Sequence, residues 1–590
     1  MDTEPTETLS RIPPAINGIQ INFCKNPLCL NFGRPASTEP QRRVAGEPPR
    51  SASDSYVLSG DSRGRTSFIC KLCGENPPIK SNLAISEELN RMTEFLVPKP
   101  SPSCPNEICQ NHSIDITTPK AYYSFGKTKS GSQRYRCRLC RTTFAIGCST
   151  LRQKRPEVNE IVFKLLVNKS PFNRIMEVAG ISAGTLYSKI NFIHQQCLSF
   201  AANQERQLQK ILVNRLYLSV DRQDHLINWK NADEKCNIAL SAIGCADNKT
   251  SYVFGIHVNY DPSLDANQVS ADSLALGDDS LRAPFRRYAR VWLEQDYMGS
   301  LERSAKKKQT KRYLRDSIQE AYDVSCARTD VEVSESPSTE TGLPYSGMQV
   351  HSEYTMYAHF FYLHKILKNV GKIRFFLDQD SGIRAACLSV FWIEILAKQC
   401  DAFYVRVNKN LTINQKRRLK GQSIRDLADF RASSAAYEPL TDHDLRHIVI
   451  KDRLEELVDI GKWNDRWLFY PFPDMSEPEK AICWLTDLQD RSYDTDHIAS
   501  LYSKATLHGI DRFFMQVRRR LSLLERPISS SSSEGRKWYG YSAYNPAMVG
   551  KLLDIFRVFY NYVELGDDKK TPAMRLGLAT KPVLLTDIVG

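Results

Sequence analysis

The segment "KIRFFLDQD" (372–380) ends a mostly apolar run in two aspartates, Asp378 and Asp380, and "SGIRAACLSVFWIEILAKQ" (381–399) follows it. The apolar run predicts a buried strand, and the second segment predicts a helix. Asp378 ends the strand directly and is the first choice for a functional carboxylate. Asp380 has three interpretations: it is an alternative to Asp378, it is a neighbour that tunes the site, or, together with Ser381, it caps the following helix.

The neighbouring segments predict three strands, a helix, a strand, a helix and a final strand. The first strand, "NRLYLSVDRQDHLINW" (214–229), carries Asp221, and "CNIALSAIGCADNKTSYVFGIHV" (236–258) supplies two more strands. A helix over 354–371 precedes the strand that ends at Asp378, and "DAFYVRVN" (401–408) is the last strand. This order is typical of a mixed sheet of the ribonuclease-H type, in which the first and fourth strands are neighbours. We therefore predict that Asp221 and Asp378 lie side by side.

Paired carboxylates repel one another unless a divalent cation lies between them. Oxygen-rich sites suit Mg²⁺ or Mn²⁺, and two such ions serve phosphodiester displacement. A third ligand is predicted in "HGIDRFFMQVRRRLSLLERP" (508–527), where Asp511 shares helical spacing with Phe514 and Val517. The alternative is a first-turn acid that the helix dipole favours. The predicted catalytic residues are Asp221, Asp378 and Asp511, and Asp224 and Asp380 compete for the first two places.

Eight of the sixteen cysteines lie before residue 141 in two copies of one pattern. "FCKNPLCLNFG" (23–33) and "SCPNEICQNHS" (103–113) share C-x-N-x-x-C-x-N, and "FICKLC" and "YRCRLC" share C-[KR]-L-C. A C-x4-C pair closed by a C-x2-C pair supplies four thiolates for Zn²⁺. The alternative is disulfides, which a reducing compartment disfavours. We predict two zinc sites, one formed by Cys24, Cys29, Cys70 and Cys73, the other by Cys104, Cys109, Cys137 and Cys140.

A basic stretch and a helical pattern follow the second cysteine pattern. Eleven Lys and Arg against two Glu from 127 to 169 are an electrostatic footprint for phosphates, with a solvated basic face as the alternative. "PFNRIMEVAGISAGTLYSKINFIHQQC" (171–197) predicts a short helix, a turn at Gly180 and a second helix, which is the helix-turn-helix pattern. The predicted DNA-binding residues are Arg134, Arg136, Arg138, Arg141, Ser182, Thr185, Tyr187, Lys189, Arg518, Arg519 and Arg520.

Composition limits the class of protein. The chain of 590 residues carries 80 Lys+Arg against 67 Asp+Glu, a net charge of +13, which favours an anionic partner. The first residues show neither the basic region nor the apolar region of a secretory signal, and no apolar run reaches the roughly 20 residues that span a bilayer. We expect a soluble, cytoplasmic protein associated with the nucleoid, without a membrane partner.

These motifs together resemble a known family. "QRYRCRLCRTTFAIG" (133–147) before a helix-turn-helix, the separated aspartates, "DRFFMQVRRRLSLLERP" (511–527) and the ending "YNPAMVGKLLDIFRVFYNYVELGDDKKTPAMRLGLA" (544–579) are similar to bacterial insertion-sequence transposases of the DDE type, closest to the insertion-sequence-one type. The resemblance implies a metal-dependent enzyme that binds double-stranded DNA at element ends and target and works as a homodimer or higher oligomer. The family's third acid is usually Glu, and Asp511 is shorter by one methylene.

The fold class expected from these observations is multidomain: small zinc-finger modules, an all-α helix-turn-helix and an α/β ribonuclease-H-like catalytic domain with insertions. Two other functions remain open, a DNA-binding regulator derived from a transposase and a ribonuclease-H-like structure-specific nuclease. The predicted boundaries are a first zinc module with linker at 1–100, a second zinc finger at 101–155, a helix-turn-helix at 156–205, a catalytic core at 210–411 with an insertion at about 260–350, an insertion domain at 412–500, and the rest of the core with the tail at 501–590.

Overall fold

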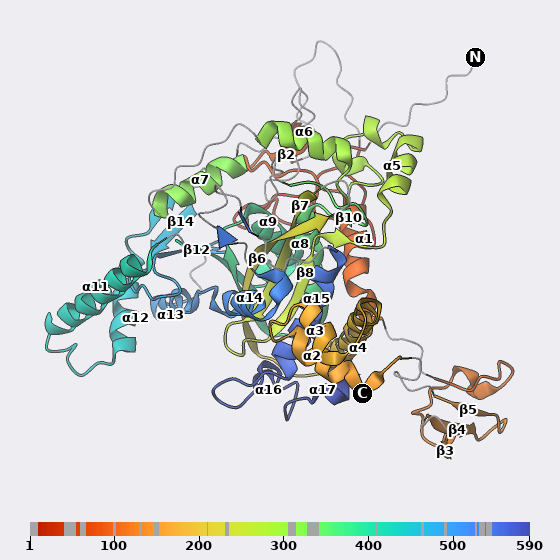
Figure 1. Cartoon of the computed structure of the whole chain (residues 1–590). Helices are drawn as coiled ribbons and strands as arrows, with labels where there is room; N and C mark the ends of the chain where they lie inside the picture. The colour runs from red at the N-terminus through yellow and green to blue at the C-terminus, as the bar shows by residue number, and fades with distance from the viewer. Residues whose placement is uncertain are drawn as a thin grey trace, which may run out of the picture.

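The computed structural model describes most of the chain (Figure 1). The described residues are 10–39, 55–59, 66–97, 102–128, 132–146, 153–208, 210–230, 235–304, 314–326, 341–408, 411–461, 465–488, 493–525, 528–529, 537–538 and 545–589.

An eight-stranded mixed sheet forms the centre of the molecule, in the order β13-β14-β15-β12-β11-β6-β7-β8. Strand β6 pairs antiparallel with β7, and β7 pairs antiparallel with β8, whereas β11 runs parallel to both β6 and β12. The predicted order of elements is confirmed for this part of the chain: β6 (Arg215–Lys230), β7 (Lys235–Asp247), β8 (Val253–Val258), α8 (Ser352–Ile366), β11 (Lys372–Asp378), α9 (Ser381–Val390), α10 (Trp392–Leu396) and β12 (Cys400–Val407).

The sheet extends beyond β12 with strands from the predicted insertion at 412–500. Strand β15 pairs antiparallel with β12, and β14 and β13 continue the sheet outward. Two helices precede these strands and form the arm that extends from the body in Figure 1. The elements of this segment are α11 (Ile413–Ala432), α12 (Asp442–Arg453), β13 (Val458–Ile460), β14 (Asp465–Phe469), β15 (Lys480–Trp484) and α13 (Thr495–Lys504).

Helices cover both faces of the sheet. Successive side chains of a strand point to opposite faces, and here the side chains on both faces are buried. Phe375 of β11 packs on Phe360 of α8, whereas its neighbour Phe376 belongs to a second core with Phe403 and Tyr502 of α13. Helix α14 (His508–Arg520) lies over β6 and β7, and α15 (Ala547–Tyr562) lies over β8. Ser219 of β6, the strand partner of Phe376, accepts the N–H of Ile510 of α14, so α13 and α14 both lie on the face that carries Phe376.

The two cysteine modules sit differently. The first contains β1 (Tyr56–Ser59) and β2 (Ser67–Cys70) and leads into α1 (Asn82–Thr93), which packs along α8 of the central body. The second is a three-stranded sheet of β3 (Tyr122–Lys127), β4 (Gln133–Cys137) and β5 (Thr143–Ala145) with a small core of its own. Figure 1 shows β3 to β5 set apart from the main body.

Three helices connect the second module to the sheet: α2 (Asn159–Leu166), α3 (Phe172–Ala179) and α4 (Ala183–Leu208). Gly180 ends α3 in a left-handed conformation with φ of +59°, which glycine adopts without steric cost. Helix α4 continues for 26 residues and packs on α15. The remaining helices of at least five residues are α5 (Ala266–Ala275), α6 (Glu294–Ser304), α7 (Leu314–Cys326), α16 (Pro572–Leu576) and α17 (Leu585–Val589); none of the helices in the described residues is both long and apolar enough to cross a membrane.

Candidate functional site

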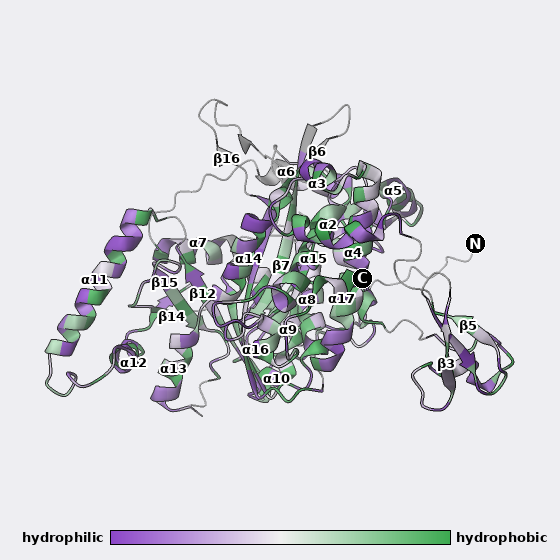
Figure 2. Cartoon of the chain, turned by 60° about the horizontal axis from the view of Figure 1, so that its bottom comes forward, coloured by the Kyte–Doolittle hydropathy of each residue, from purple (hydrophilic) through white to green (hydrophobic). Residues whose placement is uncertain are grey.

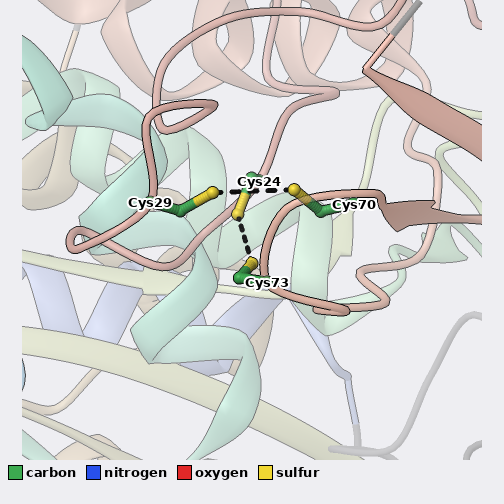
Figure 3. Close-up of side chains that lie close together, drawn as sticks. All are labelled: Cys24, Cys29, Cys70 and Cys73. Carbon is green, nitrogen blue, oxygen red and sulfur yellow. Dashed lines mark hydrogen bonds between the residues drawn. The ribbon is translucent and has the colours of Figure 1, made fainter.

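The first cysteine cluster brings together side chains from two distant segments. Figure 3 shows the sulfur atoms of Cys24, Cys29, Cys70 and Cys73 pointing toward one another. The Sγ atoms of Cys24 and Cys73 lie 3.4 Å apart, and those of Cys29 and Cys70 lie 3.6 Å apart. The first cysteine of the pattern thus meets the fourth, and the second meets the third.

The second cluster repeats this arrangement. The Sγ atoms of Cys104 and Cys140 lie 3.3 Å apart, and those of Cys109 and Cys137 lie 3.8 Å apart. In both clusters the four ligand atoms all lie within 4.8 Å of one another. The duplication that the sequence pattern predicts is therefore also a duplication of geometry.

Asparagine and tyrosine side chains support the two clusters in the same way. Asn31 donates its side-chain N–H to the sulfur of Cys70 at 3.2 Å, and Asn111 donates to the sulfur of Cys137 at 3.3 Å. These are the final asparagines of the two C-x-N-x-x-C-x-N patterns. Their role was not predicted from the sequence, although the repeated pattern contained the signal.

The tyrosines were missed as well. The Tyr56 hydroxyl accepts the N–H of Cys24 and donates to the carbonyl of Asn31. The Tyr122 hydroxyl accepts the N–H of Cys104 and donates to the carbonyl of Asn111. Each tyrosine fixes the backbone of the first cysteine relative to the backbone around the second, so the turn that presents the first two sulfurs is held in place.

Both clusters have the geometry to hold a metal such as zinc. Four sulfurs at about 2.3 Å from a tetrahedral Zn²⁺ lie about 3.8 Å from one another, close to the observed separations. N–H donors to sulfur stabilise the thiolate form, which is the form that binds metal. The pKa values of the second cluster differ: a hydrogen bond with Thr142 lowers the pKa of the Cys140 thiol to about 6, whereas burial raises the pKa of the Cys104 thiol to about 12.

Asp221 and Asp378 come from neighbouring parallel strands. Leu377 of β11 is in register with Val220 of β6, so the next residue on each strand is one of the two aspartates. Phe375, two residues before Leu377, packs on Phe360 of α8, so Leu377 and its strand partner Val220 face α8. Because side chains alternate between faces, Asp221 and Asp378 project to the opposite face, on which α14 lies. Asp221 is buried, and Asp378 is half-buried.

Hydrogen bonds from the first turn of α14 join this helix to β6 and to the turn that follows β7. The N–H of Ile510 donates to the Ser219 hydroxyl at 3.0 Å, and the N–H of Gly509 donates to the Asn248 side chain at 3.0 Å. Two turns beyond Asp511, Arg518 donates to the Gln223 side chain of β6 at 3.0 Å. Residues seven apart share one flank of a helix, so Asp511 lies on the flank of α14 that faces β6.

The position of Asp511 differs in one respect from the expectation. Phe514 and Val517 are buried, as their spacing predicts, whereas Asp511 is half-buried at the border of that stripe. Among the described residues, only the two cysteine clusters bring three or more metal-ligating atoms within 4.8 Å of one another. The oxygens of Asp221, Asp378 and Asp511 therefore share one face of the sheet without forming so compact a group.

Asp380 and Asp224, the alternatives for two of the metal-ligand positions, lie in different surroundings from Asp221 and Asp378. Asp380 is the N-cap of α9, where its side chain accepts the N–H groups of Gly382 at 2.7 Å and Ile383 at 3.2 Å. It also lies 3.5 Å from the Arg222 guanidinium. The capping interpretation is confirmed. Asp224 is exposed and, three residues beyond Asp221, projects to the other face of β6.

The predicted DNA-reading residues at the start of α4 are partly accessible. Ser182 and Tyr187 are exposed, Thr185 is half-buried, and Tyr187 packs edge-on against Phe172 of α3. Lys189 differs from the expectation, because it is only 1 % exposed and donates to the Gln153 side chain at 3.1 Å. Burial lowers the pKa of Lys189, and its position leaves no accessible surface for a base contact.

The predicted arginines lie in two places. On β4, Arg134 and Arg136 are half-buried beside aromatic rings, Arg138 follows them in an exposed turn, and Arg141 is exposed. At the end of α14, Arg519 is exposed, whereas Arg518 and Arg520 contact Gln223 and Glu564 respectively.

Comparison with known proteins assigns no family to the chain: no protein-family model matches the sequence, and no curated protein matches it either. The chemistry of the sites above is therefore the basis for any function.

Proposed function

We propose that the protein is a DNA transposase that cuts and joins DNA strands with a divalent-metal DDD mechanism. The observation that carries the proposal is the register of β6 and β11, which makes Asp221 and Asp378 neighbours on the face beneath α14. The strand order β8-β7-β6-β11-β12, with its antiparallel and parallel pairs, supports a ribonuclease-H-like core. Such a sheet carries its acidic residues at this position.

Carboxylate oxygens are the donors that Mg²⁺ and Mn²⁺ prefer, and Asp221, Asp378 and Asp511 are the residues that would hold them. Bound ions would activate the attacking oxygen and stabilise the leaving oxygen of a phosphodiester. The protein's own part is to orient the DNA. Arg518, held against Gln223 on the same flank of α14 as Asp511, gives this face positive charge for the DNA phosphates, and the next residue, Arg519, is exposed at the end of the same helix.

Helix α4 supports the binding of a DNA duplex in a fixed position relative to the central sheet. The exposed candidates for base contacts are Ser182, directly before helix α4, and Tyr187 in its second turn, and the other end of the helix is anchored in the core. There Glu205 forms a buried ion pair with Arg557 of α15, and its carboxylate also accepts the Tyr362 hydroxyl. A buried, multiply bonded pair of this kind fixes orientation, because breaking it leaves an uncompensated charge. A DNA end bound by α4 would therefore be held in one position relative to the acidic face.

The arm formed by α11 and α12 supports a further contact with DNA. Figure 2 shows α11 extending from the body, and among its 20 residues only Leu427 is buried. Its first half carries four cations within five residues and no acid: Lys416, Arg417, Arg418 and Lys420. Charges of one sign on a projecting helix suit a phosphate backbone. Joining two element ends also requires at least two copies of the chain.

The test is a strand-transfer assay on DNA that carries the element's own flanking ends, with Mg²⁺ or Mn²⁺. Asp378→Asn should lower joining by at least about 100-fold while DNA binding is unchanged, since loss of one transition-state stabiliser costs that much. Asp380→Asn is the matched control: Asn caps a helix as well as Asp does, so joining should persist. Equal loss in the two variants would contradict the assignment of Asp378.

One observation favours a second function, a DNA-binding regulator derived from a transposase. The three carboxylates do not form a compact group of the kind that the cysteines form. A regulator predicts that the wild-type protein binds the element ends and joins nothing, with binding unaffected by Asp378→Asn. Cleavage without joining would instead indicate a structure-specific nuclease.

A further inference from the structure

The second cysteine module has an aromatic and cationic surface that its zinc site does not require. Tyr123 of β3 lies directly opposite Arg136 of β4, and paired residues share a face of the sheet. By alternation, Arg134 and Arg138 project to that side as well. We call this surface the arginine-aromatic face; it consists of Tyr123, Phe125, Arg134, Arg136 and Arg138.

The guanidinium groups of this face lie over its rings. The guanidinium carbons of Arg134 and Arg136 lie 5.2 Å and 5.4 Å from the centre of the Phe125 ring. That of Arg138 lies 5.5 Å from the centre of the Tyr123 ring. The two rings meet edge to face, with centroids 6.2 Å apart. Planar cations and π-systems therefore alternate across one small surface.

The module's core is on the other face of the sheet, so these rings are not needed to build it. Tyr122, Tyr135 and Phe144 pack there around the cysteines. By contrast, Tyr123 is 37 % exposed and Phe125 is 39 % exposed. Aromatic side chains that lie in solvent on a small module, beside cations, are typical of a binding surface.

The charge of the segment identifies an anionic partner. From 116 to 156 the chain carries no Asp or Glu and ten Lys or Arg. An acidic protein would satisfy the charge alone. Unpaired bases with their phosphates satisfy both the charge and the exposed rings, because every base has a face that stacks on an aromatic ring or on a guanidinium plane.

We propose that the arginine-aromatic face binds single-stranded nucleic acid, with bases stacked on Tyr123 and Phe125 and phosphates held by the arginines. In a duplex the bases stack on one another and offer no face to these rings. The inference deepens the proposed function, on which it rests for its biological setting, since cutting and joining DNA exposes unpaired strand ends. The binding itself does not depend on the acidic face.

The experiment measures fluorescence anisotropy of the zinc-loaded full-length protein with three probes: a 20-nucleotide single-stranded DNA, the single-stranded RNA of the same sequence, and a blunt DNA duplex. The test variant is Tyr123→Leu with Phe125→Leu, which keeps apolar side chains and removes the π faces. Tyr345→Leu is the matched control, because Tyr345 is a 73 % exposed tyrosine outside the module. Zinc content of each variant verifies that the cysteine site is intact.

Stacking of one base typically contributes about 5- to 150-fold in affinity, so the double variant should bind single-stranded DNA at least about tenfold more weakly. Its affinity for the duplex should change less than about twofold, and Tyr345→Leu should behave as the wild type. Arg136→Lys, which keeps the charge and loses the planar group, should also weaken single-strand binding. Tighter binding of the RNA than of the DNA would identify RNA as the natural strand, with the same chemistry.

Unchanged single-strand affinity in the double variant would overturn the proposal. Equal losses for single strand and duplex would also overturn it, because they would identify a surface that reads phosphates alone. Failure of the proposed function would give a different result. Neither the wild type nor Asp378→Asn would join DNA, whereas the double variant would still lose single-strand binding selectively.

Discussion

In each cysteine pattern, one asparagine side chain donates a hydrogen bond to a cysteine sulfur. Asn111 is 4 % exposed and donates one N–H to the sulfur of Cys137 and another to the carbonyl of Ala121. Such donors stabilise a metal-bound thiolate and orient it. The first cysteine module has the same contact, because Asn31 donates its side-chain N–H to the sulfur of Cys70.

We expect Asn111→Ala to weaken zinc binding by about 10- to 100-fold, the usual effect of losing a partner behind a metal ligand. Competition with a chromogenic chelator measures the change. Asn414→Ala, an exposed asparagine in α11, is the control and should leave the affinity unchanged. An Asn111→Ala protein with the affinity of the wild type would show that the N–H to sulfur contact is energetically neutral.

Residue patterns predicted the ends of elements better than the partners of side chains. The strand that ends at Asp378 and the helix after it are visible in local polarity, and β11 does end at Asp378. The caps are local as well, so the alternative for Asp380 could be stated in advance. The tyrosines behind the cysteines could not, because Tyr56 lies 32 residues from Cys24 and their contact exists only in the folded chain.

At the scale of elements, the contact between α14 and the sheet depends on a glycine. A Cβ added at Gly509 would lie 2.6 Å from the Asn248 side-chain oxygen and 2.9 Å from the Ser219 hydroxyl. Both atoms accept hydrogen bonds from the first turn of α14. The close approach of this turn to β6 therefore requires a residue without a side chain.

Gly509→Ala should displace the start of α14, cost about 1–3 kcal/mol of stability and lower strand joining more than DNA binding. Thermal unfolding and the joining assay measure the two effects. Gly550→Ala in α15 is the control: no atom lies within 4 Å of an added Cβ there, and alanine in a helix interior adds up to about 1 kcal/mol of stability. Joining by Gly509→Ala at the level of Gly550→Ala would contradict the role of this contact.

The order of elements from β6 to β12 was predictable because each one has its own hydrophobic period. The extension of the sheet beyond β12 was not predictable from such local patterns. The segment at 412–500 was expected to be an insertion domain, yet Val405 of β12 pairs with Ile482 of β15, so three of its strands continue the central sheet. Pairing at a sheet edge depends on which strand is left open, and this is a property of the assembled fold.

Across the whole molecule, the two cysteine modules have the same sulfur geometry, but they are connected differently to the central body. The first is part of the central body. Glu75, near its last cysteine, forms a 3.1 Å ion pair with Arg384 of α9, and the helix that follows contributes a buried 2.9 Å pair between Glu88 and Arg290. Burial of both partners makes such pairs costly to disrupt. The second module has a core that no side chain of the central sheet enters within the described residues.

This difference gives a matched pair of substitutions, Cys70→Ser and Cys137→Ser. The two cysteines hold the same place in their patterns, and each accepts an N–H from the equivalent asparagine, Asn31 or Asn111. Each change should therefore remove one zinc ion from the protein. Cys70→Ser should lower the main unfolding temperature by more than about 5 °C, because its module packs into the central body. Cys137→Ser should shift that temperature by less than about 2 °C and abolish single-strand binding, because only the detached module loses its fold. Equal shifts in the two variants would mean that the second module is also coupled to the central sheet, and no shift in either would mean that α1 holds the first module without its metal.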